Sequence, residues 1–336
     1  MPTIALVMIA RNESRCIRRA LLSARPWVDE MVVLDTGSTD DTVAIAREAG
    51  ARVHHFTWCD DFSAARNAAL AHTRSDWRLV LDADEWLANG GQTLAKLSQS
   101  SPDFVGSIEV LSQFDQGAGQ ATASSWLPRL LPRGVSYTGR IHEQPQHALR
   151  TRRLPIQIGH DGYLTAPMRA KGDRNRLMLE RAVAEAPHDP YLHYQLGKDH
   201  EVHDRFDAAW LAYEKALRLL GTAPAREPPW RHDLILRTLY TLKARGQIDA
   251  AIELADREMP QWQDSPDFHF VLGDVLLDYA IAHPTEHAQV LPMIEHAWER
   301  CLEIGENPDL EGAVQGRGSH LARHNLDLLR DTRATF

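Results

Sequence analysis

The sequence has no apolar run long enough to cross a membrane, and it has three cysteines in 336 residues. A membrane-spanning helix needs about 20 consecutive apolar residues, and the first apolar run, Thr3 to Ala10, is far shorter. No basic segment precedes that run, as a secretory signal would require. Cys16, Cys59 and Cys301 lie far apart, without the spacing of a metal site. We therefore expect free thiols in a reducing cytoplasm.

An excess of positive charge and glycine-rich phosphate loops are also missing. Because 46 acidic residues outnumber 37 basic ones, the net charge is -9, and we expect no nucleic-acid partner. The absence of Gly-x-Gly-x-x-Gly and Walker-type loops disfavours dinucleotide and P-loop sites. A sugar-nucleotide transferase acting on phosphates would need a basic glycine loop near the N-terminus, which is also absent. The length suffices for two domains of ordinary size.

The first half of the chain alternates short β-like runs with helical patterns. These runs predict strands at residues 3–10, 30–34, 52–57 and 77–81, of which the first is expected to be buried on both faces and the fourth to be buried. Helical patterns follow the first three runs, at residues 13–23, 42–49 and 63–72. This alternation is typical of βαβ units and predicts an α/β domain with a mostly parallel sheet.

From about residue 173 onward the pattern is helical throughout. The pair Leu196-Gly197 is followed by Ala209, Tyr213 and Ala216, a spacing typical of the tetratricopeptide repeat. A weaker copy starts near Asp233, and a third has the pair Leu272-Gly273 followed late by Trp298. Three imperfect helix pairs favour a short solenoid, with an ordinary helical bundle as the alternative. We expect two domains, residues 1–168 and 169–336, the second all-α.

The segment Leu79 to Glu85 is an apolar run that ends in two carboxylates, Asp82 and Asp84. In an open α/β sheet, ligands bind beyond the carboxyl ends of the strands. Side chains alternate along an extended segment, so we expect both carboxylates on the same side. They repel one another unless a cation lies between them, and oxygen ligands suit Mg²⁺ or Mn²⁺. A helix-capping turn with a solvated acid is the structural alternative.

Polar residues also follow the other predicted strands. Arg11-Asn12-Glu13 follows the first strand, and Asp35 ends the second, where a carboxylate can accept hydrogen bonds from a base or ribose. After the third strand, Asp61 or Ser63 is expected to cap a helix. Arg66, one turn into that helix, is within reach of a diphosphate or of the aspartates. A sheet with only a structural role does not need polar residues at the ends of all its strands. Their convergence at one edge therefore predicts a ligand site.

Four ordered motifs resemble family 2 glycosyltransferases of the GT-A fold. They are Arg11-Asn12-Glu13, Asp35-Thr36-Gly37-Ser38-Thr39-Asp40, Asp60-Asp61-Phe62-Ser63 with Ala65-Arg66-Asn67, and Leu81-Asp82-Ala83-Asp84-Glu85. The closer likeness is to the bacterial branch with SunS-type peptide S-glycosyltransferases and tetratricopeptide-repeat glycosyltransferases. It covers residues 1 to about 165 strongly and the helical half moderately. The resemblance implies a GT-A, Rossmann-like catalytic domain and a UDP-sugar as donor.

The resemblance also implies roles for single residues. Asp35 would contact the uracil, Arg11 and Arg66 would line the nucleotide pocket, and the metal-diphosphate would be held by residues 82–84. The implied cofactor-binding set is Arg11, Glu13, Asp35, Arg66, Asp82 and Ala83. The implied metal ligands are Asp84, Asp82 and His160. A histidine is possible here because imidazole is an acceptable ligand for Mn²⁺. A divalent cation would stabilise the negative charge that develops on the departing nucleoside diphosphate.

A further region, Trp126 to Glu143, resembles the part of the family in which the acceptor meets the donor. Glu143 is the predicted general base, which takes a proton from an acceptor hydroxyl or thiol during attack on the anomeric carbon. His142 is the alternative for that role, or a contact to the diphosphate. The structural alternative for Glu143 is an ion pair with Arg140 or Arg129. The resemblance implies inversion, although the sequence does not exclude retention.

The leading hypothesis is therefore a metal-dependent glycosyltransferase that uses a UDP-sugar. Its helical half would position a peptide, protein or glycan acceptor, or mediate assembly into homo-oligomers. The second hypothesis is a repeat scaffold whose nucleotide-binding domain is inactive. Asp82, Asp84, Glu143 and His160 are intact, which argues against decay. The sequence leaves open the sugar, the acceptor atom and the oligomeric state.

Overall fold

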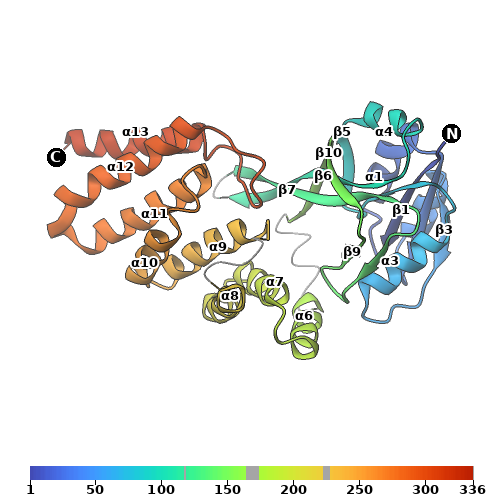
Figure 1. The fold of residues 1–336 in the computed structure, drawn as a ribbon, viewed down its shortest axis with the longest axis horizontal. Helices are drawn as coiled ribbons and strands as arrows, with labels where there is room; N and C mark the ends of the chain where they lie inside the picture. Colours follow the sequence, from blue (N-terminus) through green and yellow to red (C-terminus); the bar gives the residue numbers. More distant parts are fainter. Residues whose placement is uncertain (117–118, 164–173, 222–227, 336) are drawn as a thin grey trace. The chain divides into compact units, whose positions relative to one another are not determined.

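The chain forms two compact units in a computed structural model, Met1–Met178 and Leu179–Phe336 (Figure 1). The structure describes residues 1–116, 119–163, 174–221 and 228–335. The predicted domain boundary between residues 168 and 169 lies outside the described residues and stays a prediction. All three cysteines are free, as expected. In the described ranges, no helix combines the length and apolarity needed to span a membrane.

The first unit is built on an eight-stranded sheet with the order β3-β2-β1-β4-β7-β6-β10-β5. The strands are β1 (Ile4–Ala10), β2 (Glu30–Asp35), β3 (Arg52–His55), β4 (Trp77–Val80), β5 (Glu85–Asn89), β6 (Phe104–Gln116), β7 (Gly119–Pro132) and β10 (Arg150–Tyr163). Neighbouring strands are parallel except at β4–β7, β7–β6 and β10–β5. Only β7 and β5 therefore run against the others, which confirms the mostly parallel sheet. A separate ribbon pairs β8 (Ser136–Thr138) with β9 (Gln144–Gln146).

Helices cover both faces of this sheet because β1 is apolar on both sides. Leu6 and Met8 pack in one core cluster with α1 and α4, whereas Ala5 and Val7 pack in another with α3. Alternating side chains of one strand point to opposite faces, so a strand buried on both faces reads as a continuous apolar run. The helices are α1 (Ile17–Ala24), the 3₁₀ turn η1 (Arg25–Trp27), α2 (Thr42–Glu48), α3 (Phe62–Ala71) and α4 (Gly91–Leu97).

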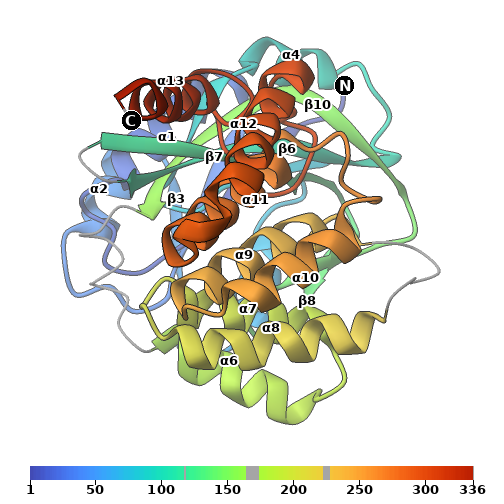
Figure 2. The ribbon, with the colours of Figure 1, turned by 90° about the vertical axis from the view of Figure 1, so that its left-hand side faces the viewer.

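The second unit consists of helices, as the pattern predicted (Figure 2). They are α7 (Pro190–Glu201), α8 (Phe206–Leu220), α9 (Arg231–Ala244), α10 (Ile248–Glu258), α11 (Pro266–Ala282), the 3₁₀ turn η2 (Pro284–Glu286), α12 (His287–Ile304) and α13 (His320–Thr335). Helix α6 (Arg174–Glu185) begins in the first unit and ends in the second. Tyr194 and Tyr213 anchor one buried cluster, and a larger one gathers side chains of α9 to α13.

The glycines of the two Leu-Gly pairs lie at close contacts between helices of this unit. A Cβ added to Gly197 in α7 would lie 2.3 Å from the ring of Tyr213 in α8. A Cβ on Gly273 in α11 would lie 2.3 Å from the indole of Trp298 in α12. Ala209 and Tyr213 are fully buried. In these two helix pairs an aromatic ring of the second helix therefore packs directly against the glycine of the first. This contact is consistent with the spacing of the repeat pattern.

Candidate active site

Asp35 ends β2 directly beside Ala10, the last residue of β1. Its side chain is almost fully buried, and its carboxylate accepts hydrogen bonds from the backbone N–H groups of Gly37 and Ser38, at 3.2 Å each. The Nδ1 atom of the exposed His55 lies 3.3 Å from the same carboxylate. Asp35 therefore closes the turn after β2, and its predicted contact with uracil stays a prediction.

The loop after β1 is tied to the loop after β2. Asn12, in the first loop, has a positive φ of 56°. Its backbone N–H donates a hydrogen bond to Ser38 Oγ at 2.9 Å. Its side-chain Oδ1 accepts one from the backbone N–H of Thr39 at 2.8 Å. Arg11 is exposed beside it, and Glu13 is half-buried. These hydrogen bonds fix the ends of β1 and β2 relative to each other, and the Arg11 side chain is exposed to solvent.

Helix α3 starts at the expected place. Asp61 is its N-cap and accepts a hydrogen bond from the backbone N–H of Ala64 at 2.9 Å. Ser63, the other candidate cap, donates instead to Asp61 at 2.8 Å. The cap fixes the first turn of the helix and so places Arg66 one turn in, near the carboxyl ends of β1 and β4.

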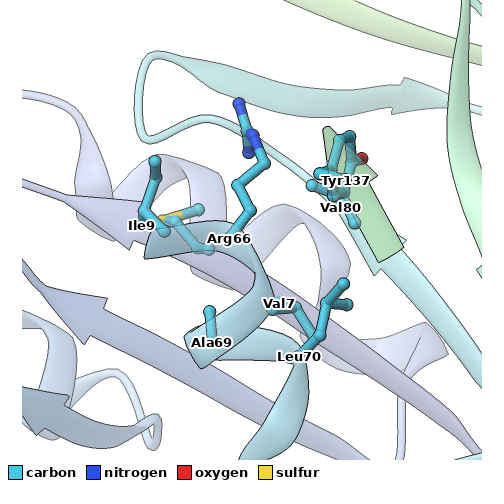
Figure 3. A pocket seen from close by; sticks show the side chains of 8 residues that line it. Val7, Ile9, Arg66, Ala69, Leu70, Val80 and Tyr137 are labelled. Carbon is cyan, nitrogen blue, oxygen red and sulfur yellow. The ribbon is translucent and has the colours of Figure 1, made fainter. Parts of the chain in front are cut away.

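The stem of Arg66 lines a narrow gap with apolar side chains of β1, α3 and β4 (Figure 3). This gap leaves no room for a water molecule, so it is a packing defect of the core and not a ligand pocket. Figure 3 shows the guanidinium extending away from Ala69 and Leu70. The stem is thus anchored in the core while the charged end reaches the strand ends.

Asp82 is held by two arginines. Its Oδ1 accepts from Arg66 Nη2 at 2.6 Å, and its Oδ2 accepts from Arg129 Nη2 at 2.9 Å. Arg129 also donates to Glu85 at 2.5 Å, and Arg66 donates through Nε to Glu143. Burial alone would raise the pKa of Asp82, but the two guanidinium groups lower it well below its usual range. Burial dominates at Glu85 and raises its pKa.

The segment between β4 and β5 is a turn. Strand β4 ends at Val80, and the backbone N–H of Glu85 donates to the carbonyl of Asp82 at 3.0 Å. The alternation expected for an extended chain therefore does not apply to Asp82 and Asp84, because a turn has no two-residue period. The charge of Asp82 is balanced here by guanidinium groups, and Ala83 is buried in the sheet core.

Asp84 and His160 form a second polar pair. Asp84 Oδ2 lies 3.6 Å from His160 Nε2, and only 10% and 13% of the two side chains are exposed. His160 sits on β10, and its Nδ1 lies 3.1 Å from Ser112 Oγ on β6. When Nδ1–H donates to Ser112, Nε2 carries the lone pair that a metal ligand needs. Sequence reasoning named Asp84 and His160 but missed Ser112.

The predicted metal triad is not assembled. Within residues 1–116 and 119–163 of the first unit, no three histidine, cysteine or acidic side chains come together as a metal site. Asp84 and His160 are brought together, whereas the third predicted ligand, Asp82, is engaged by Arg66 and Arg129. Two of the three predicted ligands, Asp84 and His160, are thus adjacent at this edge.

Glu143 pairs with Arg66, a partner that the sequence analysis did not name; the alternatives considered were Arg140 and Arg129. The loop that carries it contains two left-handed residues, Gly139 at φ 96° and His142 at φ 51°. His142 is half-buried. This loop therefore places Glu143, the candidate base, beside the Arg66 guanidinium that also pairs with Asp82.

The start of that loop is docked on helix α3. Asn67 Nδ2 donates to the carbonyl of Tyr137 at 2.9 Å, and the backbone N–H of Tyr137 donates to Asn67 Oδ1 at 2.8 Å. The backbone N–H of Phe62 donates to the carbonyl of Arg140 at 2.8 Å. Burial raises the pKa of Tyr137 to about 12. Residues 137–143 are thereby fixed relative to Arg66.

The end of β10 is clamped by helix α1 and the residues before it. Asp161 accepts two hydrogen bonds from Arg15 at 3.0 Å and one from Arg19 at 2.8 Å. Asp161 itself is 6% exposed, and the guanidinium of Arg19 lies 3.9 Å from the ring centroid of Trp86. This clamp fixes the strand segment next to His160, and the sequence analysis gave no signal for it.

Comparisons with known proteins identify relatives of the chain. The family description Glycosyl transferase family 2 matches residues 5–130. A TPR repeat-containing protein of Synechococcus elongatus is 35% identical over 292 residues, which cover 81% of this chain and 69% of that protein. The glycosyltransferase SunS of Bacillus subtilis is 28% identical over 218 residues, or 62% of this chain and 51% of SunS. The chain thus matches about half the length of SunS.

One solved structure with similarity is glucosyl-3-phosphoglycerate synthase from Mycobacterium tuberculosis in complex with Mn²⁺, UDP and glucosyl-3-phosphoglycerate. It is 28% identical, and the match covers 34% of this chain and 45% of that chain with a TM-score of 0.27. A TM-score this low supports no conclusion about the present chain.

Proposed function

We propose that this chain, which belongs to glycosyl transferase family 2 and is a glycosyltransferase, transfers a sugar from a UDP-sugar with the help of a divalent cation. The acceptor would be a peptide, protein or glycan. The observations that carry the proposal are the Arg66–Glu143 and Asp84–His160 pairs, which join separate segments of the first unit at one edge of the sheet, where β2 also ends in Asp35. Ligands of open α/β sheets bind at such edges.

Asp84 and His160 fit a divalent cation. Bonds of about 2.1 Å from one ion would place neighbouring ligand atoms about 3 Å apart and opposite ones about 4.2 Å apart. The 3.6 Å between Asp84 Oδ2 and His160 Nε2 exceeds the spacing of neighbouring ligand atoms, so the two side chains would close by about 0.6 Å around the ion. One oxygen and one imidazole nitrogen suit Mn²⁺ or Mg²⁺, the former better. When bound, the ion would stabilise negative charge on the leaving diphosphate.

Glu143 is the proposed general base. Its carboxylate is paired with the guanidinium of Arg66, a contact that restricts its orientation. The docked loop 137–143 gives it a fixed position, which acid–base catalysis requires before any matching of pKa values. Glu143 would take the proton of the acceptor hydroxyl or thiol as that atom attacks the anomeric carbon. This single displacement inverts the anomeric configuration.

Arg11 and Asp35 are the proposed contacts to the nucleotide. Arg11 is exposed directly after β1, where its charge can meet a phosphate group. Asp35 already accepts two backbone N–H groups, and a carboxylate has room for about four hydrogen bonds in all. A uracil N–H can therefore bind without breaking the turn. Glu13 lies on the same loop as Arg11 and belongs to the same proposed pocket.

The helical unit is proposed to hold the acceptor. Stacked helix pairs present extended surfaces that commonly bind polypeptide segments, and the Gly197–Tyr213 and Gly273–Trp298 contacts support repeat packing of this kind. The competing hypothesis, a scaffold with an inactive nucleotide domain, predicts no turnover of any nucleotide-sugar.

A panel of nucleotide-sugars separates these hypotheses. We expect UDP release from one UDP-sugar with Mn²⁺, little release with EDTA, and a loss of about 100-fold in Asp84→Ala, because removal of one group that stabilises the transition-state charge costs this much. Asp76→Ala is the matched control, since Asp76 pairs with Arg133 at the surface. No turnover with any donor would favour the scaffold, whereas equal turnover in wild type and Asp84→Ala would contradict the metal role of Asp84.

A further inference from the structure

Gly162 lies on β10 against both candidate metal ligands. A Cβ added there would be 2.2 Å from Asp84 Oδ2 and 2.4 Å from His160 Nε2. Both distances are well below 3.0 Å, a limit that real Cβ contacts do not cross. His160 and Gly162 are two residues apart on one strand, so they face the same side. Any side chain at position 162 would therefore collide with both ligand atoms at once.

The backbone at Gly162 does not itself demand glycine. Gly139 and Gly134 have positive φ values, which L-residues avoid, but Gly162 is not among the positive-φ glycines of the described chain. Position 162 requires a residue without a side chain, because no room is left for a Cβ atom. A second glycine on β10, Gly159, also requires space, because its Cβ would lie 2.3 Å from the ring of Trp86.

The two glycines differ in what they accommodate. Gly159 faces ring atoms of a tryptophan, which is an ordinary packing contact, whereas Gly162 faces one carboxylate oxygen and one imidazole nitrogen. Neither of these polar groups can move aside cheaply. His160 is held through its Nδ1 contact with Ser112, and the Asp84 side chain is 10% exposed. The adjacent backbone is clamped through Asp161 by Arg15 and Arg19.

We propose that Gly162 is a positioning residue for the divalent cation. Its missing side chain lets Asp84 Oδ2 and His160 Nε2 approach to a distance that one ion can bridge. A methyl group there would push the two ligand atoms away from that geometry. The inference rests on the proposed metal site and extends it to a residue that cannot bind the ion itself.

Mn²⁺ titration followed by electron paramagnetic resonance, with UDP present, tests this role in the full chain. We expect Gly162→Ala to weaken Mn²⁺ binding by about 10-fold or more, the range known for residues that orient metal ligands. Gly91→Ala in α4 is the matched control: its Cβ would lie 2.2 Å from the ring of Trp27, so it should lower the melting temperature while leaving the Kd for Mn²⁺ unchanged. Equal Mn²⁺ binding by wild type and Gly162→Ala would overturn the role of Gly162.

Two further outcomes are informative. If the wild-type chain binds no Mn²⁺ and no Mg²⁺, the proposed metal site fails, and the role of Gly162 fails with it. If Gly162→Ala is too unstable for titration, the double variant Gly162→Ala/His160→Ala is measured instead. Removing the imidazole should restore part of the lost melting temperature, because one of the two collisions disappears. No restoration would show that the methyl group does not meet His160, and would overturn the inference.

Discussion

Arg66 Nη2 lies 2.6 Å from Asp82 Oδ1. The same guanidinium donates to Glu143 through Nε, so one side chain of helix α3 connects the β4–β5 turn with the loop that carries the candidate base. Arg66 is 7% exposed, and its stem is packed in the core. The turn that carries Asp82 and the loop that carries Glu143 are therefore coupled through a buried cation.

The first prediction concerns the loss of this cation. Arg66→Leu should lower the free energy of unfolding by about 3 kcal/mol, because it leaves the largely buried Glu143 carboxylate without its Arg66 partner and Asp82 with Arg129 alone. Urea unfolding followed by tryptophan fluorescence measures the change. Arg52→Leu is the control: Arg52 is 56% exposed and pairs with Glu30 at the surface, and such pairs contribute less than about 1 kcal/mol. Equal losses in both variants would contradict the coupling.

The second prediction concerns the docking of the base loop. Asn67→Ala removes both hydrogen bonds to the backbone of Tyr137 and should cost about 1–3 kcal/mol, because two buried backbone groups lose their partners. Amide hydrogen exchange in residues 136–146 should become faster, and UDP release should slow. Asn89→Ala, which removes only a bond to the adjacent Gly90, should change none of these. Unchanged exchange in Asn67→Ala would exclude the docking role.

The third prediction concerns the repeat glycine in α7. Alanine is favoured over glycine by about 1 kcal/mol in a helix interior, so Gly197→Ala would stabilise the chain if the position were open. The collision with Tyr213 at 2.3 Å predicts the opposite sign, a loss of about 1–3 kcal/mol from overpacking. Thermal unfolding distinguishes the two outcomes. A higher melting temperature for Gly197→Ala would contradict the tight packing of α7 on α8.

The fourth prediction concerns pH. Burial raises the pKa of the Asp274 carboxyl in α11 to about 6 from its ordinary value of 3.8. Between these values the folded state holds more protons than the unfolded state, so the free energy of unfolding falls as pH rises from about 4 to about 6. A shift of about two units corresponds to at most about 3 kcal/mol. Asp274→Asn should remove this contribution.

Thermal melts at two pH values check the sign. At pH 8 we expect Asp274→Asn to be more stable than the wild type, since the ionised carboxylate is unfavourable where it is buried. At pH 4 the two proteins should be nearly equal. Asp278→Asn serves as control, because Asp278 is 37% exposed and pairs with Lys243 at 3.5 Å. A wild type that is the more stable protein at pH 8 would refute the prediction.

The sequence predicted the secondary-structure elements that depend on interactions between residues close together in the chain. The β-like runs gave β1 to β4 to within a few residues, most clearly at β1, which is buried on both faces and therefore apolar throughout. The cap at Asp61 was also predictable, since an N-cap bond joins residues three apart. The Leu-Gly pairs of α7 and α11 located two helix contacts, because the repeat spacing encodes which small residue meets which ring.

The partners in the site were harder to predict because they come from distant strands. Ser112 on β6 and Arg129 on β7 reach His160 and Asp82 only through the order and register of the sheet, and no local period encodes either. The alternation argument failed at Asp82 and Asp84 because the chain turns there. Gly162 carries no chemistry of its own, so only its surroundings reveal why it is small.

Crystals grown with Mn²⁺ and UDP provide the most direct measurement of the central claim, that a divalent cation binds between Asp84 and His160 at the edge of the sheet. Anomalous diffraction locates manganese without reference to activity. We expect one strong peak within about 2.4 Å of both Asp84 Oδ2 and His160 Nε2, with the UDP diphosphate beside it. A manganese peak elsewhere, with these two atoms uncoordinated, would contradict the account.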